Sequence, residues 1–385
     1  MPTHTLSPRV DPSPTAHEPR AWSASSIALA IFIPGISIVA AVSIWAAGQS
    51  SAGTAMPVVA PAIAPVVAPS RGAAGMSGMP DMTTTASTAA AATTTVAPHT
   101  PYDATLPPLG AGTVHKYTIR LKDETFEIAP GVRYQGWTFE GTAPGPVIHV
   151  RQGDMVDVTL VNGGAIPHSI DFHAALTAPN VSFASVPAGG SLHFRFRAET
   201  PGAFMYHCGT PPVLAHIANG MYGAIIVDPK EGLPPVAKSV VLVSGEWYLQ
   251  GDGVKAPATL DFDKARLMQP DYVTFNGYAA QYKDHPITAS PGDTVRFYVV
   301  DAGPSLDTDF HVVGAILDRV YLDGTTTDVL HGVQTQLVPA GGGMVFDVKF
   351  RDRGIFPFVS HAFAAVDMGE VGLVNVGNVS GTMSH

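Results

Sequence analysis

The tripeptide Asp-Phe-His occurs twice in the chain, each time at nearly the same distance behind a Gly-Asp pair. The first copy consists of Gly153-Asp154 and Asp171-Phe172-His173, and the second of Gly292-Asp293 and Asp309-Phe310-His311. The spacing within the two copies differs by one residue. Self-similarity at a fixed interval indicates that one structural unit is repeated. We therefore expect two tandem copies of one fold, joined near residues 229–237, where proline and charge cluster.

The residues around these motifs show the alternating hydrophobic pattern of β-strands. Residues 147–161 alternate between apolar and polar side chains around a Gly-Asp turn, and residues 191–197 do the same. Alternation with a period of two is typical of half-buried strands, and no long amphipathic helical pattern competes with it. The 39 glycines and 34 prolines suit short strands joined by turns. The sequence therefore predicts an all-β fold built from two β-sandwiches.

A long apolar segment lies near the N-terminus. Residues 22–47 run for 26 residues without a charge, and a membrane-spanning helix needs about 20. Arg9 and Arg20 precede this segment, which predicts that residues 1–21 form a cytoplasmic tail. The alternative is an export signal cleaved near Ala46-Ala47. In both cases the rest of the chain is extracytoplasmic, on the periplasmic or outer cell-surface side.

Low-complexity sequence follows the apolar segment. Residues 48–111 are mainly Ala, Pro, Thr, Ser and Gly, a composition that cannot bury enough apolar surface to fold. We expect a disordered linker. Met76, Met79 and Met82 recur within it; thioethers at this spacing can bind Cu(I) loosely, but methionines scattered in biased sequence are the simpler interpretation. The regions expected beyond it are a first domain over 112–232, a second over 233–379 and a C-terminal tail over 380–385.

Charge and cysteine content narrow the function. Charged residues make up 14% of the chain and the formal net charge is −10. This balance argues against a nucleic-acid partner, which would need clustered lysine and arginine. Cys208 is the single cysteine of the chain, so it cannot form an internal disulfide. In an exported protein such a cysteine is free, paired with another chain, or bound to a metal.

The surroundings of Cys208 favour a metal. His216 follows it by eight residues, and Met221 follows His216 by five. One thiolate, two imidazoles and a weak thioether are the ligands of a blue-copper electron-transfer site. His168, close to the first Asp-Phe-His motif, supplies the second imidazole. We predict that His168, Cys208, His216 and Met221 bind a type 1 copper.

The second repeat lacks these ligands. When the repeats are aligned on Asp-Phe-His, Leu306 takes the place of His168 and the position of Cys208 falls near Ser360. We therefore expect no blue copper in the second domain.

Four histidines remain, His173 and His207 in the first domain and His311 and His361 in the second. Three of them could form an all-imidazole copper site with an open position for a small ligand. Successive residues of a strand point to opposite faces, so His207 would face outward where Cys208 faces the first copper. The covalent path between the two metals is then one dipeptide long.

Together these motifs resemble those of the copper-containing nitrite reductases, over about residues 112–378. The resemblance implies two tandem cupredoxin-like Greek-key β-sandwiches and a homotrimer with one type 1 and one type 2 copper per subunit. The type 2 ligands it implies are His173, His207 and, from the neighbouring subunit, His361. Electrons would enter at the type 1 copper and pass through His207-Cys208 to the type 2 copper.

The resemblance also implies the reaction, NO₂⁻ + 2H⁺ + e⁻ → NO + H₂O. The family's active-site aspartate and histidine match Asp171 and His311, which would deliver the protons, and Val313 falls where the family has an aliphatic residue beside the substrate. The partners implied are nitrite and a small redox donor such as a cupredoxin or a c-type cytochrome. Residues 209–215, between Cys208 and His216, form a loop one residue shorter than in the best-known members, which leaves the donor open.

Two other classes deserve comparison. A multicopper oxidase needs His-X-His motifs and a histidine after the cysteine, whereas Cys208 precedes Gly209 and the sequence contains no His-X-His. A membrane-tethered blue-copper electron carrier or copper-binding protein would use the first site alone. That function would leave the four other histidines without a role, and a count of bound copper distinguishes it from an enzyme.

Overall fold

In a computed structural model of the protein, residues 99–381 are described. They form β-strands joined by turns and a few short helices, so the prediction of an all-β fold is confirmed. The predicted tail (1–21), the apolar segment (22–47), linker residues 48–98 and residues 382–385 lie outside the described residues. Between residues 99 and 381, no helix is long and apolar enough to cross a membrane.

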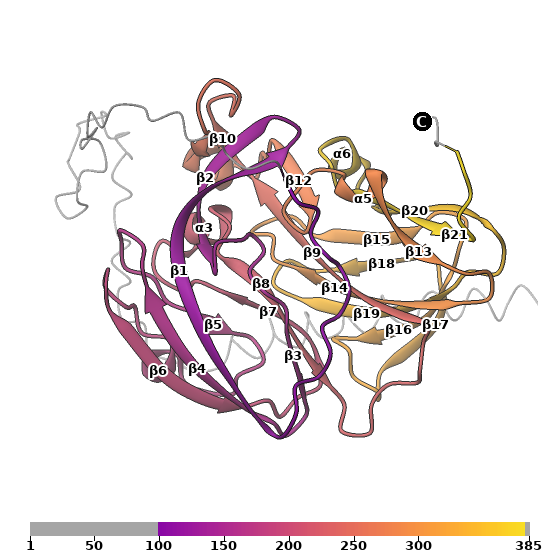
Figure 1. The fold of residues 1–385 in the computed structure, drawn as a ribbon, viewed down its shortest axis with the longest axis horizontal. Coiled ribbons are helices and arrows are strands. Elements are labelled where there is room, and N and C mark those ends of the chain that lie inside the picture. Colours follow the sequence, from indigo (N-terminus) through magenta and orange to yellow (C-terminus); the bar gives the residue numbers. More distant parts are fainter. Residues whose placement is uncertain (1–98, 382–385) are drawn as a thin grey trace, which may run out of the picture. The chain divides into compact units, whose positions relative to one another are not determined.

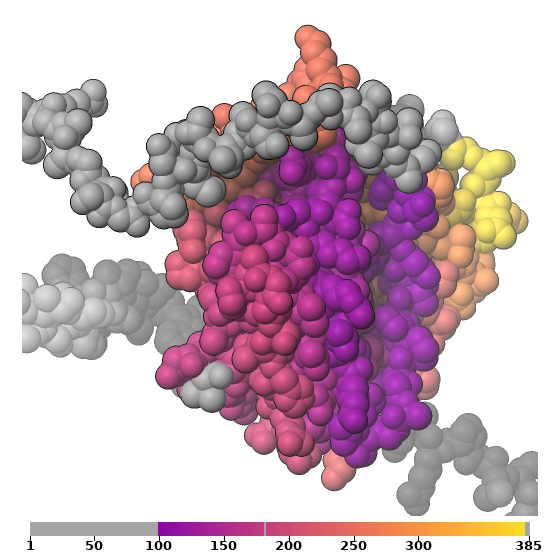
Figure 2. Space-filling view, turned by 60° about the vertical axis from the view of Figure 1, so that its left-hand side comes forward, coloured from indigo at the N-terminus to yellow at the C-terminus, as the bar shows by residue number. Residues whose placement is uncertain are grey.

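The first part of the described chain builds two four-stranded sheets, with the strand orders β2-β1-β4-β6 and β3-β8-β7-β5. The bounds are β1 Val114–Ala129, β2 Val132–Phe139, β3 Ile148–Arg151, β4 Met155–Asn162, β5 Asp171–Phe172, β6 Ser191–Arg197, β7 Gly202–His207 and β8 Tyr222–Asp228. β1 pairs with β4 in parallel, as β3 does with β8. Figure 2 shows one face of this part, with indigo β1 beside the magenta surface of the strands that follow it.

Burial in the first sandwich follows the pattern of the sequence. In β4, Val156, Val158 and Leu160 are fully buried, and the residues between them are half-buried. These three side chains belong to an apolar cluster between the sheets that also contains Cys208 and Met221. Two of the predicted copper ligands therefore lie in the core of this sandwich.

The second part builds a six-stranded sheet, β12-β9-β14-β19-β16-β17, and a five-stranded sheet, β13-β21-β20-β15-β18. Its strands are β9 Lys238–Trp247, β10 Leu249–Gln250, β11 Thr259–Leu260, β12 Tyr272–Phe275, β13 His285–Ala289, β14 Thr294–Asp301, β15 Thr308–Val312, β16 Leu317–Leu322, β17 Val329–Val333, β18 Thr335–Val338, β19 Gly343–Lys349, β20 Gly354–Ser360 and β21 Val371–Val376. The parallel pairs β9–β14 and β13–β21 repeat those of the first sandwich. The core of this second part combines aliphatic side chains with aromatic ones, among them Phe297, Phe310, Phe346 and Phe358.

The helices are short. Their bounds are α2 Pro179–Ser182, α3 Val213–Ala218, α4 Phe262–Arg266, α5 Gln281–Asp284 and α6 Phe363–Asp367. α3 connects β7 to β8 and carries His216, while α6 makes the corresponding connection between β20 and β21 (Figure 1).

The two sandwiches share a further apolar cluster. Tyr222 and Ile226 of β8 pack with Val243 of β9, Val300 of β14 and Val345 of β19. These side chains come from both parts of the chain and are fully or almost fully buried. Burial of apolar area stabilises the contact by about 25 cal/mol per Å², so the pair behaves as one packed unit.

Residues 99–111 differ from the expectation of a disordered linker. Ala104 is buried, and its carbonyl oxygen accepts a 2.7 Å hydrogen bond from the N–H of Val241. The N–H of Leu106 donates to the carbonyl oxygen of Ser239 over 3.0 Å. This segment therefore adds backbone pairing along β9, which its Ala, Pro and Thr composition does not indicate.

Candidate metal centres

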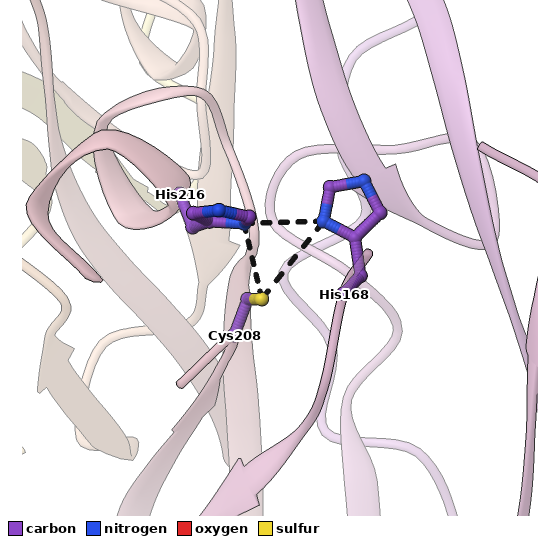
Figure 3. A group of neighbouring side chains, drawn as sticks. All are labelled: His168, Cys208 and His216. Atoms are coloured by element: carbon purple, nitrogen blue, oxygen red, sulfur yellow. Dashed lines mark hydrogen bonds between the residues drawn. The ribbon is translucent and has the colours of Figure 1, made fainter. Parts of the chain in front are cut away.

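Cys208, His168 and His216 converge in the core of the first sandwich (Figure 3). Cys208 Sγ lies 3.2 Å from His216 Nδ1 and 3.9 Å from His168 Nδ1, and the two Nδ1 atoms are 3.1 Å apart. All three side chains are buried. In the described part of the chain, this is the one group of three His, Cys, Asp or Glu side chains whose ligand atoms lie within 4.8 Å of one another.

Backbone hydrogen bonds set the positions of these ligands. His168 and Val186 exchange two N–H···O bonds, of 3.1 and 2.7 Å. The Cys208 N–H donates to the Met221 carbonyl oxygen over 3.1 Å, and the Met221 N–H donates to the His216 carbonyl oxygen over 3.2 Å. Met221 is fully buried in the same cluster as Cys208. The four predicted type 1 ligands thus come from one end of the sandwich.

Burial keeps both imidazoles neutral. Desolvation lowers the pKa of His168 to about 4, against a smaller opposing effect of Asp123. Desolvation, with a further contribution from His168, lowers the pKa of His216 to about 4. The indole of Trp137 packs against both rings, at centroid distances of 5.4 and 4.8 Å. Neutral imidazoles and one thiol at this spacing fit a soft metal ion such as copper.

The second predicted site begins with His173 and His207, whose Nε2 atoms are 3.1 Å apart. His173 Nδ1 lies 3.0 Å from the Gly341 carbonyl oxygen, and His207 Nδ1 lies 3.0 Å from the Cys208 carbonyl oxygen. Because a carbonyl oxygen can only accept, both Nδ1 atoms carry the hydrogen. In the neutral rings the two Nε2 lone pairs therefore converge, an arrangement that a cation stabilises. Burial is the main cause that lowers the pKa of His207.

Asp171 lies beside this pair, because it faces His207 in the β5–β7 pairing. In the second sandwich, the rings of His311 and His361 are 5.2 Å apart between centroids. His311 Nδ1 donates to the Gln334 carbonyl oxygen over 2.7 Å. His361 is exposed, and Val313 is 38% exposed.

The described chain thus brings the remaining histidines together as two pairs, not as one triad. His361 completes no three-residue group with His173 and His207, since the sole such group within residues 99–381 is the one around Cys208. Within residues 99–381, no third His, Cys, Asp or Glu side chain lies close enough to complete such a group with the His173–His207 pair.

Comparison with known proteins places this geometry in a family. The chain is 42% identical over 268 residues to a copper-containing nitrite reductase of Neisseria meningitidis serogroup B, covering 67% of this chain and 68% of the relative. The chain belongs to the copper-containing nitrite reductase family. A relative from Alcaligenes faecalis is 31% identical over 66% of this chain and 73% of its own.

Solved structures agree with the sequence comparison. A copper nitrite reductase from Nitrosomonas europaea superposes with a TM-score of 0.64 at 33% identity, over 69% of this chain and 94% of that one. A multicopper oxidase superposes with a TM-score of 0.62 at 28% identity, over 69% and 89%. The sequence model of a family described as multicopper oxidase matches residues 120–232. Nitrite reductases of this family and multicopper oxidases are therefore both similar to this chain in fold.

The structure corrects the alignment of the two repeats. In the first sandwich, the Ser169 N–H donates to Cys208 Sγ over 3.3 Å. In the second, the Asp309 N–H donates to Ser360 Oγ over 3.1 Å. Asp309 therefore corresponds to Ser169, and Thr308 to His168, whereas the sequence alignment placed Leu306 there. A shift of two residues keeps every side chain on its face of the strand, so the Asp-Phe-His match is offset by two.

In the corrected alignment, His311 of the second sandwich corresponds to Asp171 of the first. The N–H of Val313 donates to the Pro357 carbonyl oxygen over 2.8 Å, as the N–H of His173 donates to the Met205 carbonyl oxygen over 3.1 Å. The two residues predicted to deliver protons therefore occupy equivalent positions in the two sandwiches.

Oxygen-bearing side chains replace three of the four predicted copper ligands in the second sandwich, and Ala365 takes the place of the fourth, His216. The Glu370 N–H donates to the Ala365 carbonyl oxygen over 2.9 Å, which mirrors Met221 and His216. Glu370 is fully buried, and its Oε1 accepts from the hydroxyls of Ser244 and Thr308 over 2.6 and 2.9 Å. Burial raises the pKa of Glu370 to about 7. The sequence did not indicate this carboxyl, because Glu370 takes the place of Met221 only when the two repeats are aligned by their hydrogen bonds.

Proposed function

We propose that the protein is an oxidoreductase that reduces nitrite to nitric oxide, as in denitrification, with copper at two sites. The observation that carries the proposal is that His207 and Cys208, consecutive residues, belong to two separate ligand clusters. Copper held at these sites would supply a store for one electron at the first and a redox-active Lewis acid for nitrite at the second. Membership of the nitrite reductase family supports the substrate.

The side chains of the two sites differ in their access to solvent, and this would give the sites different roles. Cys208, His168, His216 and Met221 would hold the type 1 copper in a buried, water-poor core. Such burial excludes nitrite from the first site, because its ligands are covered by protein. The exposed side of His173 instead leaves the second ligand pair accessible to a small anion.

Two further groups would handle protons. Asp171 and His311 occupy equivalent positions, and the reaction NO₂⁻ + 2H⁺ + e⁻ → NO + H₂O consumes two protons. His311 Nδ1 is held by the Gln334 carbonyl oxygen, which leaves its Nε2 to carry and release a proton. Imidazole and carboxyl groups are among the side chains that most often serve as general acids. Val313, exposed on the same strand end, would crowd the anion.

The third type 2 ligand would be His361 from a neighbouring copy. Within the described residues His361 joins no group with His173 and His207, and it is exposed on the surface. Phe363 beside it is 56% exposed and packs against the His361 ring at 4.8 Å. An exposed aromatic side chain next to an exposed ligand suits a contact between subunits. This supports a homotrimer in which each interface completes one site.

The finer architecture and location are part of the same proposal. We infer two cupredoxin-like Greek-key sandwiches, attached through residues 22–47 to the cytoplasmic membrane and facing the periplasm or cell surface. The donor would be a small cupredoxin or c-type cytochrome. Fractionation of cells that express the full chain tests the anchor: it predicts recovery in the membrane pellet, whereas recovery of a shortened, soluble chain would show cleavage instead.

Multicopper oxidase activity is the second candidate, because a multicopper oxidase and this chain superpose closely. The assay that separates the two supplies the purified full chain with a reduced donor and either nitrite or dioxygen. We expect nitric oxide from nitrite and no four-electron consumption of dioxygen. Rapid oxygen uptake with no nitric oxide, from protein that contains two coppers per chain, would contradict the proposal.

A further inference from the structure

Three hydroxyl groups connect the protein surface to the sulfur of Cys208. Ser185 Oγ lies 2.8 Å from Thr210 Oγ1, which lies 3.1 Å from Ser169 Oγ, and Ser169 Oγ lies 3.9 Å from Cys208 Sγ. Ser185 is exposed, Thr210 is 9% exposed and Ser169 is fully buried. The hydroxyls come from three loops, which precede β6, follow β7 and precede β5.

The hydrogen bonds around Ser169 give this chain a direction. A hydroxyl has two acceptor lone pairs and one hydrogen. Ser169 Oγ accepts from the Gly209 N–H over 3.0 Å and from the Thr210 hydroxyl over 3.1 Å. Both lone pairs are then occupied, so its hydrogen is left to point at Cys208 Sγ. Because Thr210 donates to Ser169, the Ser185 hydroxyl donates to Thr210.

We propose that Ser169, Thr210 and Ser185 form a one-way hydrogen-bond chain that tunes the Cys208 thiolate and thereby the reduction potential of the type 1 site. Ser169 contributes twice, because its N–H also donates to Cys208 Sγ over 3.3 Å. Hydrogen bonds in series polarise one another, and in a buried, low-dielectric site each is stronger than in water. Donors aimed at a cysteine sulfur withdraw its charge, which favours the reduced state of a copper site.

The chain also accounts for the structure of the short Cys208–His216 loop. Gly209 and Thr210, the first two residues after the cysteine, are both tied to Ser169. The Ser169 side chain therefore contacts both this loop and the Cys208 sulfur. Thr210 and Ser185 act through Ser169, so all three are positioning residues. The inference rests on the proposed copper at Cys208 and is independent of whether nitrite is the substrate.

The test is the reduction potential of the coloured copper in the purified full chain, followed through its visible absorption. Thr210→Val keeps the shape and removes the hydroxyl, while Ser185→Ala removes the exposed end and Ser169→Ala the buried one. We expect the equilibrium constant for reduction by a fixed donor to fall roughly fivefold for Ser169→Ala, the effect of about one net hydrogen bond. The decrease should be smaller for Thr210→Val, because Thr210 only polarises Ser169, and smallest for Ser185→Ala.

Two further variants isolate the hydroxyl itself. Thr210→Ser restores the donor and should recover the original potential. Thr177→Val removes a hydroxyl that bonds Ser182 over 3.0 Å and is not joined to the sulfur; it should leave the potential unchanged.

Equal potentials in wild type, Thr210→Val and Ser169→Ala would overturn the proposal, as would a decrease that Thr210→Ser fails to restore. Absence of the visible band in the wild-type protein loaded with copper would instead refute the copper site itself. The two failures are therefore distinguishable.

Discussion

His207 and Cys208 are neighbours in sequence whose side chains enter different ligand clusters. Cys208 Sγ lies 3.2 Å from His216 Nδ1 in the core of the first sandwich, and His207 Nε2 lies 3.1 Å from His173 Nε2 at its edge. Because the two residues are consecutive, one peptide joins the clusters. His207 Nδ1 also donates to the Cys208 carbonyl oxygen over 3.0 Å. Under the proposed function, an electron at the sulfur would cross this one peptide to reach the His173–His207 pair.

Removal of the thiolate should abolish the first site alone. We expect Cys208→Ala to lose the intense visible absorption and one of the two coppers per chain, because no other soft anionic ligand is present in the sequence. Metal analysis and a visible spectrum check this. A variant that keeps its colour would contradict the assignment of Cys208.

Replacement of His361, the exposed histidine proposed as the shared ligand, should affect the second site alone. His361→Ala is expected to lose the type 2 copper and nearly all nitrite turnover while the colour persists, because His173 and His207 then lack a third ligand. His331→Ala, which alters an exposed histidine of β17, is the matched control. Metal content and turnover are compared in both. Full copper content in His361→Ala would refute the role of His361 as a shared ligand.

A change in the proton-delivering carboxyl should slow turnover without loss of metal. Asp171→Asn keeps the shape but cannot donate as an acid, and loss of a general acid lowers rates by roughly 10²–10⁴-fold. The visible spectrum and both coppers should be retained. Asp263→Asn, on the exposed first turn of α4, serves as the control. Equal turnover in wild type and Asp171→Asn would exclude Asp171 from proton transfer.

The buried carboxyl of the second sandwich predicts a pH-dependent stability. Burial raises the pKa of Glu370 from 4.5 to about 7 in the folded protein. Between these values the folded state binds the proton that the unfolded state has released, so the free energy of unfolding decreases as pH rises from about 4.5 to 7. The decrease attributable to this group is about 3 kcal/mol.

Glu370→Gln removes this titration, so it should flatten the decrease and be more stable than wild type above pH 7. Denaturant unfolding across this range measures the difference. Glu231→Gln, an exposed substitution, should follow wild type. Parallel curves for wild type and Glu370→Gln would show that the carboxyl is not protonated in the folded state.

That the predicted ligand side chains lie close together could be predicted from the sequence, because metal coordination demands particular residue types. The single cysteine with His216 and Met221 behind it indicated the first cluster, and the structure brings His168 to it as expected. The pairing of His173 with His207 likewise follows from neighbouring strands.

Contacts that depend on tertiary proximity were not predictable. Trp137 and Thr210 lie in segments far from His168 in sequence, and nothing in their residue types indicates a copper site. The two-residue offset that makes Thr308 the equivalent of His168 could not be seen in the sequence. Side chains of a strand alternate with a period of two, so the Asp-Phe-His alignment put every side chain on the same face as the correct one does. The pairing of residues 99–111 with β9 uses backbone atoms, which any composition supplies.

The central claim is tested most directly by a single-turnover experiment on the copper-loaded protein. The chain is fully reduced, the excess donor is removed, and nitrite is added without oxygen while the visible absorption and nitric oxide are recorded together. We predict that the colour returns as nitric oxide appears, with one electron consumed per nitric oxide, and that His361→Ala stays bleached. Return of the colour without nitric oxide, or at the same rate in His361→Ala, would contradict electron transfer from Cys208 through His207 to bound nitrite.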